Sequence, residues 1–282
     1  ESIRWRPALL MATLMSLSRV MPEKAKDTAR QVVRKVVEDL EKRLAEPLRQ
    51  AVRGALARSV RNSRPRASEI DWPSTIKKNL KHYQPEHRTI IPERLVGFGR
   101  KGQALREIVL CVDQSGSMAG SVVYAGVFGA VLASMRAVRT RMVVFDTAVA
   151  DLSEHLHDPV DIIFGVQLGG GTDINLALTY CEQVISRPAD TICVLITDLF
   201  EGGDRAEMLK RAAAIKASGV NLITLLALSD DGAPAFDRTN AEALSAMGIP
   251  VFACTPDRFP ELMAAAIKGQ DLSGWGGTNE GR

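Results

Sequence analysis

Five short apolar runs in the second part of the chain constrain its fold more than any other feature. They are rich in β-branched and aliphatic residues and cover residues 108–112, 142–145, 191–196, 221–228 and 250–254. Continuous apolar strands of this kind are typical of a parallel sheet that is buried on both faces. Stretches with helical periodicity follow the runs, at about 121–138, 174–186, 205–217, 240–247 and 259–268. This alternation predicts an α/β fold with a doubly wound, mostly parallel sheet flanked by helices.

The charge distribution divides the chain into two unlike parts. Its 282 residues carry a net charge of +3, but residues 1–105 hold 23 Lys and Arg against 11 Asp and Glu, whereas residues 106–282 hold 13 against 22. We therefore predict a basic, mainly α-helical N-terminal region over 1–105 and an α/β domain over 106–270. The Gly-rich segment 271–282 is predicted to be a flexible tail.

Helical periodicity also marks the basic region. Apolar residues recur at three- and four-residue spacing from Val32 to Leu48, which predicts a helix with one apolar stripe. Pro47 is expected to kink or end this helix, with a second helical run over 48–60. The polar stretch 61–68 is interpreted as a linker. Beyond it we expect a short helix that begins near Trp72-Pro73 and an extended segment over 89–100.

Oxygen-bearing side chains stand at the ends of two apolar runs and before one helix. Asp113, Ser115 and Ser117 follow the first run in the sequence Asp-Gln-Ser-Gly-Ser. Thr172 follows three glycines and precedes a helical stretch, and Asp198 follows the run 191–196. Because ligands of doubly wound sheets bind at the carboxyl ends of the strands, we expect these side chains to meet. Carboxylate and hydroxyl oxygens are hard ligands that suit Mg²⁺.

This set of residues resembles the metal-ion-dependent adhesion site of von Willebrand factor type A (VWA) domains. The resemblance covers about residues 106–270, and the metal ligands that it implies are Asp113, Ser115, Ser117, Thr172 and Asp198. In that family the serines, and sometimes the threonine, contact the metal directly, and the aspartates act largely through water. An acidic residue of a partner protein fills the remaining coordination position. Mg²⁺ is the expected ion, with Mn²⁺ or Ca²⁺ as alternatives.

Other interpretations of these and nearby residues are plainer. The Asp-Gln-Ser-Gly-Ser turn could be only a helix N-cap. Glycines 169–171 lack the Gly-Lys-Ser/Thr that a nucleotide P-loop needs. Asp146 follows the run 142–145 and could border the site, although a loop-entry role is the simpler interpretation. His155 and His157 alternate as on one strand face, but without a third ligand they are interpreted as surface groups.

The cysteines and the hydropathy bear on the cellular compartment. Cys111, Cys181, Cys193 and Cys254 each lie within or beside an apolar run and form no CxxC pair, so we expect buried free thiols. No stretch approaches the ~20 apolar residues that a membrane span needs, and the apolar segment 7–21 lacks a signal-peptide cleavage pattern. These features predict a cytoplasmic protein that does not enter the membrane.

Three functions are compatible with the sequence. The layout resembles bacterial CoxE-like VWA proteins, which implies a protein-binding adaptor that works with a MoxR-type AAA+ ATPase, or its client, in chaperone-like remodelling or metal-centre assembly. Nucleic-acid binding ranks second, because the basic region includes the cluster Arg58, Arg61, Arg64 and Arg66. An enzyme ranks last, because Asp146 is the one candidate base that the sequence offers near the metal ligands. We therefore expect no catalytic activity.

Overall fold

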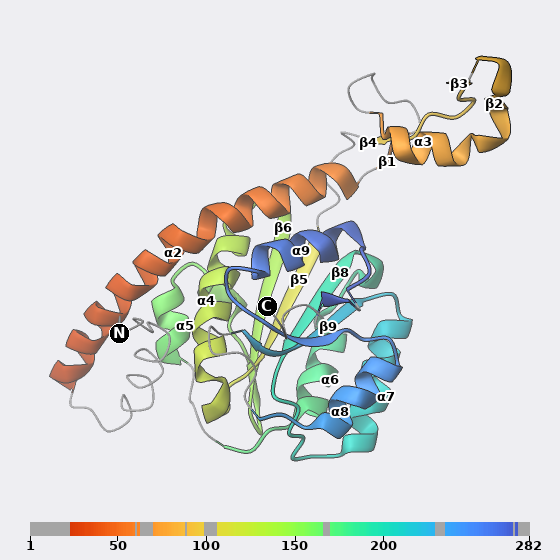
Figure 1. Cartoon of the computed structure of the whole chain (residues 1–282). Coiled ribbons are helices and arrows are strands. Elements are labelled where there is room, and N and C mark those ends of the chain that lie inside the picture. The colour runs from red at the N-terminus through yellow and green to blue at the C-terminus, as the bar shows by residue number, and fades with distance from the viewer. Residues whose placement is uncertain are drawn as a thin grey trace, which may run out of the picture.

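A six-stranded sheet lies at the centre of the computed structural model, which describes residues 23–59, 61–62, 70–87, 89–98, 106–165, 170–228, 235–272 and 274–275 (Figure 1). Its strands are β5 (Arg106–Asp113), β6 (Val138–Phe145), β7 (Val149–Asp151), β8 (Thr191–Ile196), β9 (Asn221–Leu228) and β10 (Val251–Cys254). They are arranged in the order β10-β9-β8-β5-β6-β7, and every neighbouring pair is parallel except β6 and β7. The predicted fold class is confirmed.

The strand order reverses beside β5. From β5 the chain proceeds to β6 and β7 on one side, and it then returns to place β8, β9 and β10 on the other side. The chain therefore leaves β5 toward one side of the sheet and leaves β8 toward the other. The carboxyl ends of these two strands form a topological switch point, where doubly wound folds bind their ligands.

Helices cover both faces of the sheet. One face carries α4 (Ala119–Ala133), α5 (Pro159–Gly165) and α9 (Phe259–Lys268) in one hydrophobic core. The other carries α6 (Ile174–Val184), α7 (Arg205–Ala217) and α8 (Arg238–Ala246) in a second core. On the first face the rings of Phe128 and Phe259 stack with their centroids 4.4 Å apart, which joins α4 to α9.

The long helix α2 (Glu23–Ser59) packs on the first face, along α9 and α4 (Figure 1). Its apolar stripe is buried, since Leu44 and Leu48 are 2% and 0% exposed, and each buried leucine contributes about 1.5–3 kcal/mol. Arg34 and Arg43 add ion pairs to Asp158 and Asp257 at 3.2 Å and 3.3 Å. These pairs are largely exposed and contribute little. The basic helix thus docks on the acidic domain mainly through apolar contact.

Pro47 does not end α2, which was one of the two outcomes that the sequence predicted. The helix continues through Pro47 to Ser59, so the expected second run is part of one helix. Proline removes one backbone donor and crowds the preceding turn, which disfavours a helix interior. Here Pro47 is exposed, while Leu44, Leu48 and Val52 on either side of it are buried against the domain. Tertiary packing of that face outweighs the local preference.

Several other element boundaries differ from the expected ones. The helix expected over 121–138 ends at Ala133, and β6 already begins at Val138. The start of β6 was missed because polar residues follow Val138, so the first half of the strand lacks a continuous apolar run. Neither β7 nor α5 was predicted. By contrast, α7, α9, β8 and β9 occupy the expected ranges.

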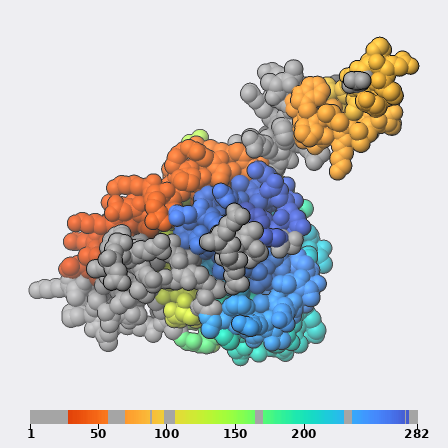
Figure 2. Space-filling model, viewed as in Figure 1, coloured from red at the N-terminus to blue at the C-terminus, as the bar shows by residue number. Residues whose placement is uncertain are grey.

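A small module follows α2 and precedes the sheet domain. Strands β1 (Arg61–Asn62) and β4 (Gly97–Phe98) pair at its base. Between them lie α3 (Trp72–Lys78), a 3-10 turn (Leu80–His82), β2 (Tyr83–Gln84), a second 3-10 turn (Pro85–His87) and β3 (Thr89–Ile90). The module projects beyond the C-terminal end of α2, away from the sheet (Figures 1 and 2). The short helix near Trp72 is confirmed, with Asp71 as its N-cap. Of the predicted linker, residues 63–68 lie outside the described residues.

The cysteines and the segment after α9 complete the interior. All four cysteines are free and buried, as predicted. In the segment expected to be a flexible tail, Leu272 is 2% exposed and the Trp275 ring lies 6.3 Å from the Phe252 ring, whereas residues 276–282 lie outside the described residues. These first residues of the segment pack because two large apolar side chains close the end of the core.

One segment within the described ranges, Gly116–Ala133, is long and apolar enough to cross a membrane, with a mean hydropathy of 1.6. However, 78% of it is buried inside the protein, and it includes all of α4. A core helix of a globular domain meets the same test of length and composition. The expected cytoplasmic location stays a prediction.

Candidate metal centre

Asp113 is the last residue of β5 and lies at the switch point. Its side chain is fully buried, and both of its oxygens accept hydrogen bonds. Oδ1 accepts from the backbone N–H of Ser115 at 2.8 Å, and Oδ2 accepts from the Thr197 hydroxyl at 2.8 Å. Burial raises the pKa of Asp113 above its ordinary value, and the nearby Asp198 carboxylate adds to the rise, although both hydrogen bonds oppose it. The carboxyl group is therefore held in one orientation at the sheet edge.

A chain of oxygens leads from Ser115 to Asp198. The Ser115 and Ser117 hydroxyl oxygens are 3.2 Å apart, and the Ser117 hydroxyl donates to Asp198 Oδ2 at 2.6 Å. Ser117 lies on the solvent side, whereas Asp198 is 4% exposed. The structure thus brings together four of the five side chains that the sequence singled out, from two strand ends that are far apart in the chain.

Thr172, the fifth residue, lies on a loop that is tied to both neighbouring strand ends. Its carbonyl oxygen accepts from the N–H of Gly202, in the loop after Asp198, at 2.7 Å. The next residue, Asp173, donates its N–H to the carbonyl of Asp146, which follows β6, at 2.8 Å. A Cβ atom on Gly202 would lie 2.8 Å from the Thr172 carbonyl oxygen, so this close approach requires glycine.

Sequence reasoning missed three residues that shape this edge. Thr197 holds Asp113, as described above, and directly precedes Asp198. Glu201 accepts from the N–H of Ile174 at 2.7 Å and from that of Gly203 at 3.1 Å, which fastens the loop after β8 to the start of α6. Burial raises the pKa of Glu201, and the Asp173 charge adds to the rise. The position of Thr197 at the end of the apolar run 191–196 could have indicated it, but no spacing rule indicates Glu201.

Leu199 is the third missed residue, because its backbone has a φ of 66°, in the left-handed region. An L-residue pays about 1–2 kcal/mol there. Its N–H donates to the Thr197 hydroxyl at 3.1 Å, its carbonyl accepts from the Asn240 side chain at 2.9 Å, and its own side chain is fully buried. The strained turn directs the chain sharply away after Asp198.

The glycines of the site differ in whether their position requires glycine. Gly116 does not have a positive φ, and a Cβ atom there would meet nothing within 4 Å, so the turn itself does not require glycine. The position of Gly170 does require glycine, since its φ is +126° and an added Cβ atom would lie 3.4 Å from the Asp146 carboxylate. Gly169 lies outside the described residues.

Asp146 and Asp173 have the structural roles that were expected of them. Asp146 Oδ1 accepts from the N–H of Ala148 at 2.7 Å, as a loop-entry residue does. Asp173 is the N-cap of α6 and accepts from the N–H of Leu176 at 2.7 Å.

The histidines and arginines lie elsewhere. His155 ends a 3-10 turn (Ser153–His155), so the expected strand face is wrong; the chain turns there because Asp151 accepts from the N–H of Ser153. This turn follows the antiparallel strand β7, which runs back along β6 away from the carboxyl edge. Arg64 and Arg66 of the basic cluster lie outside the described residues, as do the side chains of Arg58 and Arg61.

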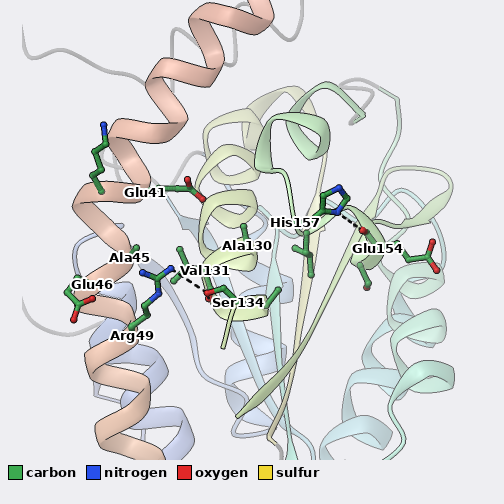
Figure 3. A pocket seen from close by; sticks show the side chains of 13 residues that line it. Glu41, Ala45, Glu46, Arg49, Ala130, Val131, Ser134, Glu154 and His157 are labelled. Atoms are coloured by element: carbon green, nitrogen blue, oxygen red, sulfur yellow. Dashed lines mark hydrogen bonds between the residues drawn. The ribbon is translucent and has the colours of Figure 1, made fainter. Parts of the chain in front are cut away.

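A groove of about 740 Å³ lies between α2, α4 and the turn after β7 (Figure 3). Its lining includes Glu41, Arg49, Ser134 and His157, and Arg49 donates to the Ser134 hydroxyl at 3.5 Å. None of the five predicted metal ligands lines it. The groove is therefore a feature separate from the candidate centre.

The oxygen atoms present suit a hard divalent ion. In an octahedral Mg²⁺ site with metal–oxygen distances of about 2.1 Å, neighbouring ligand oxygens are about 3.0 Å apart. The Ser115 and Ser117 hydroxyls are separated by 3.2 Å, close to that spacing. Among the described residues, no group of three or more His, Cys, Asp or Glu side chains is placed to hold a metal. The candidate centre does not need such a group, because its ligands would be two carboxylates and several hydroxyl oxygens.

Comparison with known proteins identifies the family. Residues 44–263 match the family model described as "VWA domain containing CoxE-like protein". A protein of Escherichia coli strain K12, named "Uncharacterized protein YehP", is 35% identical over 270 residues, which cover 95% of this chain and 71% of that protein.

Solved structures of low identity also align with the chain. A von Willebrand factor type A protein from Catenulispora acidiphila is 11% identical with a TM-score of 0.45, over 58% of this chain and 42% of that one. An aerotolerance-related membrane protein from Bacteroides fragilis is 15% identical with a TM-score of 0.41, over 58% of this chain and all of that one. The family match spans most of the chain, and such domains indicate a role in protein interaction. The chain belongs to the family of CoxE-like proteins that contain a VWA domain.

Proposed function

We propose that this protein is a metal-dependent adaptor that binds an acidic side chain of a partner protein at the edge formed by β5 and β8. The observation that carries the proposal is the position of Ser117, whose hydroxyl lies 2.6 Å from Asp198 and 3.2 Å from the Ser115 hydroxyl. These oxygens, with Asp113 and Thr172, would hold Mg²⁺. The bound ion supplies a Lewis-acidic position that a carboxylate can fill.

The side chains of the candidate centre form a buried base and an exposed top. Asp113 and Asp198 are buried and held by hydrogen bonds, so they provide a fixed negative charge beneath the ion. Ser117 and Gly116 lie on the solvent side and leave room for an incoming group. Because only two carboxylates would face a divalent ion, the site keeps an attraction for a third carboxylate from outside.

The surroundings favour a particular kind of partner. Phe200, directly after the site, is 50% exposed, and Leu176 in the first turn of α6 is 39% exposed. The acidic residues Asp173, Glu201 and Asp204 lie on the same two loops. A partner segment that places an apolar side chain and a cation beside its metal-binding carboxylate would complement this edge.

Family membership supports a binding role rather than catalysis, and a MoxR-type AAA+ ATPase or its client is the partner class that we propose. The work of such a pair would be chaperone-like remodelling or metal-centre assembly.

The proposal is tested first by calorimetric titration of Mg²⁺ into the whole chain. Wild type should bind the ion, and Asp113→Ala/Ser115→Ala should lose at least ~100-fold in affinity, as expected when a carboxylate and a hydroxyl ligand are removed. The matched control is Asp204→Ala, an exposed acid of the neighbouring loop that caps α7. Equal affinity of wild type and the double variant would contradict the metal site.

The partner is tested by pull-down from an extract of the source cells with Mg²⁺ or with EDTA, with proteins identified by mass spectrometry. Recovery of an AAA+ ATPase or its client only with the metal and the intact site is the expected result. Equal recovery with EDTA and with the double variant would assign binding to another surface, and recovery of RNA would replace the adaptor by a nucleic-acid-binding function.

A further inference from the structure

The short helix α3 buries polar side chains and exposes apolar ones. Thr75 and Asn79, one turn apart, are 1% and 2% exposed. The neighbouring row, also at four-residue spacing, consists of Trp72, Ile76 and Leu80, which are 52%, 44% and 60% exposed. A surface helix ordinarily has the opposite arrangement, with its apolar row against the protein.

The buried polar row is fully engaged, so the module does not rely on the apolar row for its fold. The Thr75 hydroxyl donates to the Val96 carbonyl at 3.1 Å and accepts from the Val96 N–H at 3.0 Å. The Asn79 amide donates to the carbonyls of Thr75 and Arg94 at 2.7 Å and 2.8 Å. Its oxygen accepts from the N–H groups of Glu93 and Arg94 at 3.0 Å and 3.2 Å.

Two further large apolar side chains of the module are exposed. Tyr83 and Ile91, next to the β2–β3 pair, are 49% and 59% exposed. We call Trp72, Ile76, Leu80, Tyr83 and Ile91 the α3 surface. It holds five of the eight large apolar side chains that are exposed among the described residues, within one small module. Proteins rarely gather exposed apolar side chains in this way unless a partner covers them.

The sheet domain does not supply that cover. The module stands clear of the described part of the domain in the view that Figures 1 and 2 share. Its link to the rest is the β1–β4 pair at its base. Among the described residues, no part of the sheet domain therefore covers the α3 surface.

Charge indicates what kind of occupant fits. Lys77, Lys78 and Lys81 lie on α3 and the turn after it, and no acidic residue occurs between Trp72 and Lys81. Glu93 contacts Lys81 at 3.9 Å and His82 at 3.0 Å. Among the described residues neither Lys77 nor Lys78 has an ion-pair partner, so both can attract an acidic group. A second copy of the same surface would bring like charges together. Three of the five apolar side chains are aliphatic and cannot stack on bases, which favours a protein over a nucleic acid.

We propose that the α3 surface binds an acidic, amphipathic helical segment of a partner protein. The apolar side chains of the segment would cover Trp72, Ile76 and Leu80, and its carboxylates would pair with Lys77 and Lys78. This surface is separate from the metal edge, so its binding does not depend on Mg²⁺.

The test measures fluorescence anisotropy of a labelled helical peptide against the whole chain. The probe carries leucines on one face and glutamates elsewhere; a scrambled peptide of the same composition and a version with lysines for glutamates serve as reference peptides. We expect the acidic peptide to bind, with and without EDTA, and neither reference peptide to match it. Leu80→Asp and, independently, Ile76→Asp should each weaken binding at least ~10-fold, as for anchor residues of an interface.

Charge and position are tested by two further variants. Lys77→Glu/Lys78→Glu should weaken binding about fivefold or more and flatten its salt dependence. Val32→Asp, at a 41% exposed apolar residue of α2, should leave binding unchanged. Circular dichroism checks that each variant folds, and all substituted residues are exposed.

Four outcomes would overturn the proposal. They are the absence of binding, equal binding of the scrambled peptide, tighter binding of the lysine peptide, and binding that Leu80→Asp leaves intact. An RNA oligonucleotide bound through the lysines in place of the acidic peptide would assign the surface to nucleic acid. A concentration-dependent dimer in sedimentation, abolished by Leu80→Asp, would assign it to a second copy.

Discussion

At the carboxyl edge of the sheet, apolar strands hold polar side chains near solvent, whereas in the module of residues 70–98 polar side chains hold apolar ones in solvent. Asp113 ends β5 and Asp198 comes shortly after β8, and nearly all side chains of these two strands are buried. Trp72 and Leu80 instead lie beside a helix row that is fixed by Asn79. Each region thus contains two kinds of side chain: those that its own hydrogen bonds and packing bury, and those that reach solvent, such as Ser117 at the sheet edge and Leu80 in the module.

The difference lies in what stabilises each region. The sheet edge rests on two large hydrophobic cores, so its polar side chains can be altered with modest loss of stability. The module has no comparable core, and a few hydrogen bonds around Asn79 fix its loops. Local stability should therefore depend on polar residues in the module and on apolar residues in the sheet domain.

The largest expected effect is that of Asn79→Ala, which removes four hydrogen bonds to the backbone of Thr75, Glu93 and Arg94. We expect a loss of roughly 3–5 kcal/mol in the local stability of the module. Hydrogen exchange should show loss of protection over residues 70–98, with that of the sheet domain unchanged. Gln84→Ala, at an exposed polar residue of β2, is the control. Unchanged protection in Asn79→Ala would show that apolar contacts hold the module after all.

Thr197→Val sharpens the comparison from the side of the sheet. The substitution keeps the shape but removes the hydroxyl that donates to Asp113 and accepts from Leu199. We expect the free energy of unfolding to fall by about 1–3 kcal/mol, measured by urea denaturation of the metal-free protein. The Asp113 pKa should rise further, because one of the bonds that lower it is lost. A larger loss than in Asn79→Ala would break the comparison.

Thr224→Val is the matched control and has the opposite sign. Thr224 in β9 is fully buried, and among the described residues its hydroxyl oxygen has no hydrogen-bond partner. Valine removes an unsatisfied polar atom without changing the shape, so stability should rise by up to about 1 kcal/mol. Urea denaturation beside Thr197→Val measures both. A loss of stability here would indicate that the hydroxyl does have a partner.

The two regions also differ in how far the sequence predicted them. Apolar runs predicted the strands and the polar residues at their ends. The meeting of Asp113, Ser117 and Asp198 followed from the rule that ligands bind at strand ends. Those signals are local or topological. Glu201 and Leu199 did not follow, because their roles depend on contacts between loops that sequence spacing does not encode.

The module was predicted only as a short helix and an extended segment. Its inverted arrangement was hidden because Trp72, Ile76 and Leu80 have the spacing of an ordinary buried row. Which row faces inward depends on the partners that Thr75 and Asn79 find in residues 93–96. The prediction that Pro47 could end the helix failed for a related reason, since packing of its neighbours outweighed its own preference. Periodicity thus identifies a face but not what covers it.

The smallest expected effect lies at Asp151, where polar groups lie near the surface in the ordinary way, and it provides a reference for both regions. Although burial alone would raise the pKa of Asp151, hydrogen bonds from Ser153 and Tyr180 and the charge of Arg141 hold it below its usual value. The Tyr180 hydroxyl donates to Oδ2 at 2.8 Å, and Arg141 lies 3.7 Å from the same oxygen.

Because the folded pKa of Asp151 is lower than the unfolded value of about 3.9, its carboxylate stabilises the protein above that pH. This contribution is lost as the pH falls through the folded value. Tyr180→Phe removes one bond to the carboxylate and should reduce the loss by less than ~1 kcal/mol. Urea midpoints between about pH 3 and pH 7 should therefore fall less steeply toward acid in Tyr180→Phe than in wild type, and least in Asp151→Asn. Parallel curves for all three proteins would mean that this surface cluster is screened by solvent, and that the contrast between the sheet edge and the module rests on buried polar groups alone.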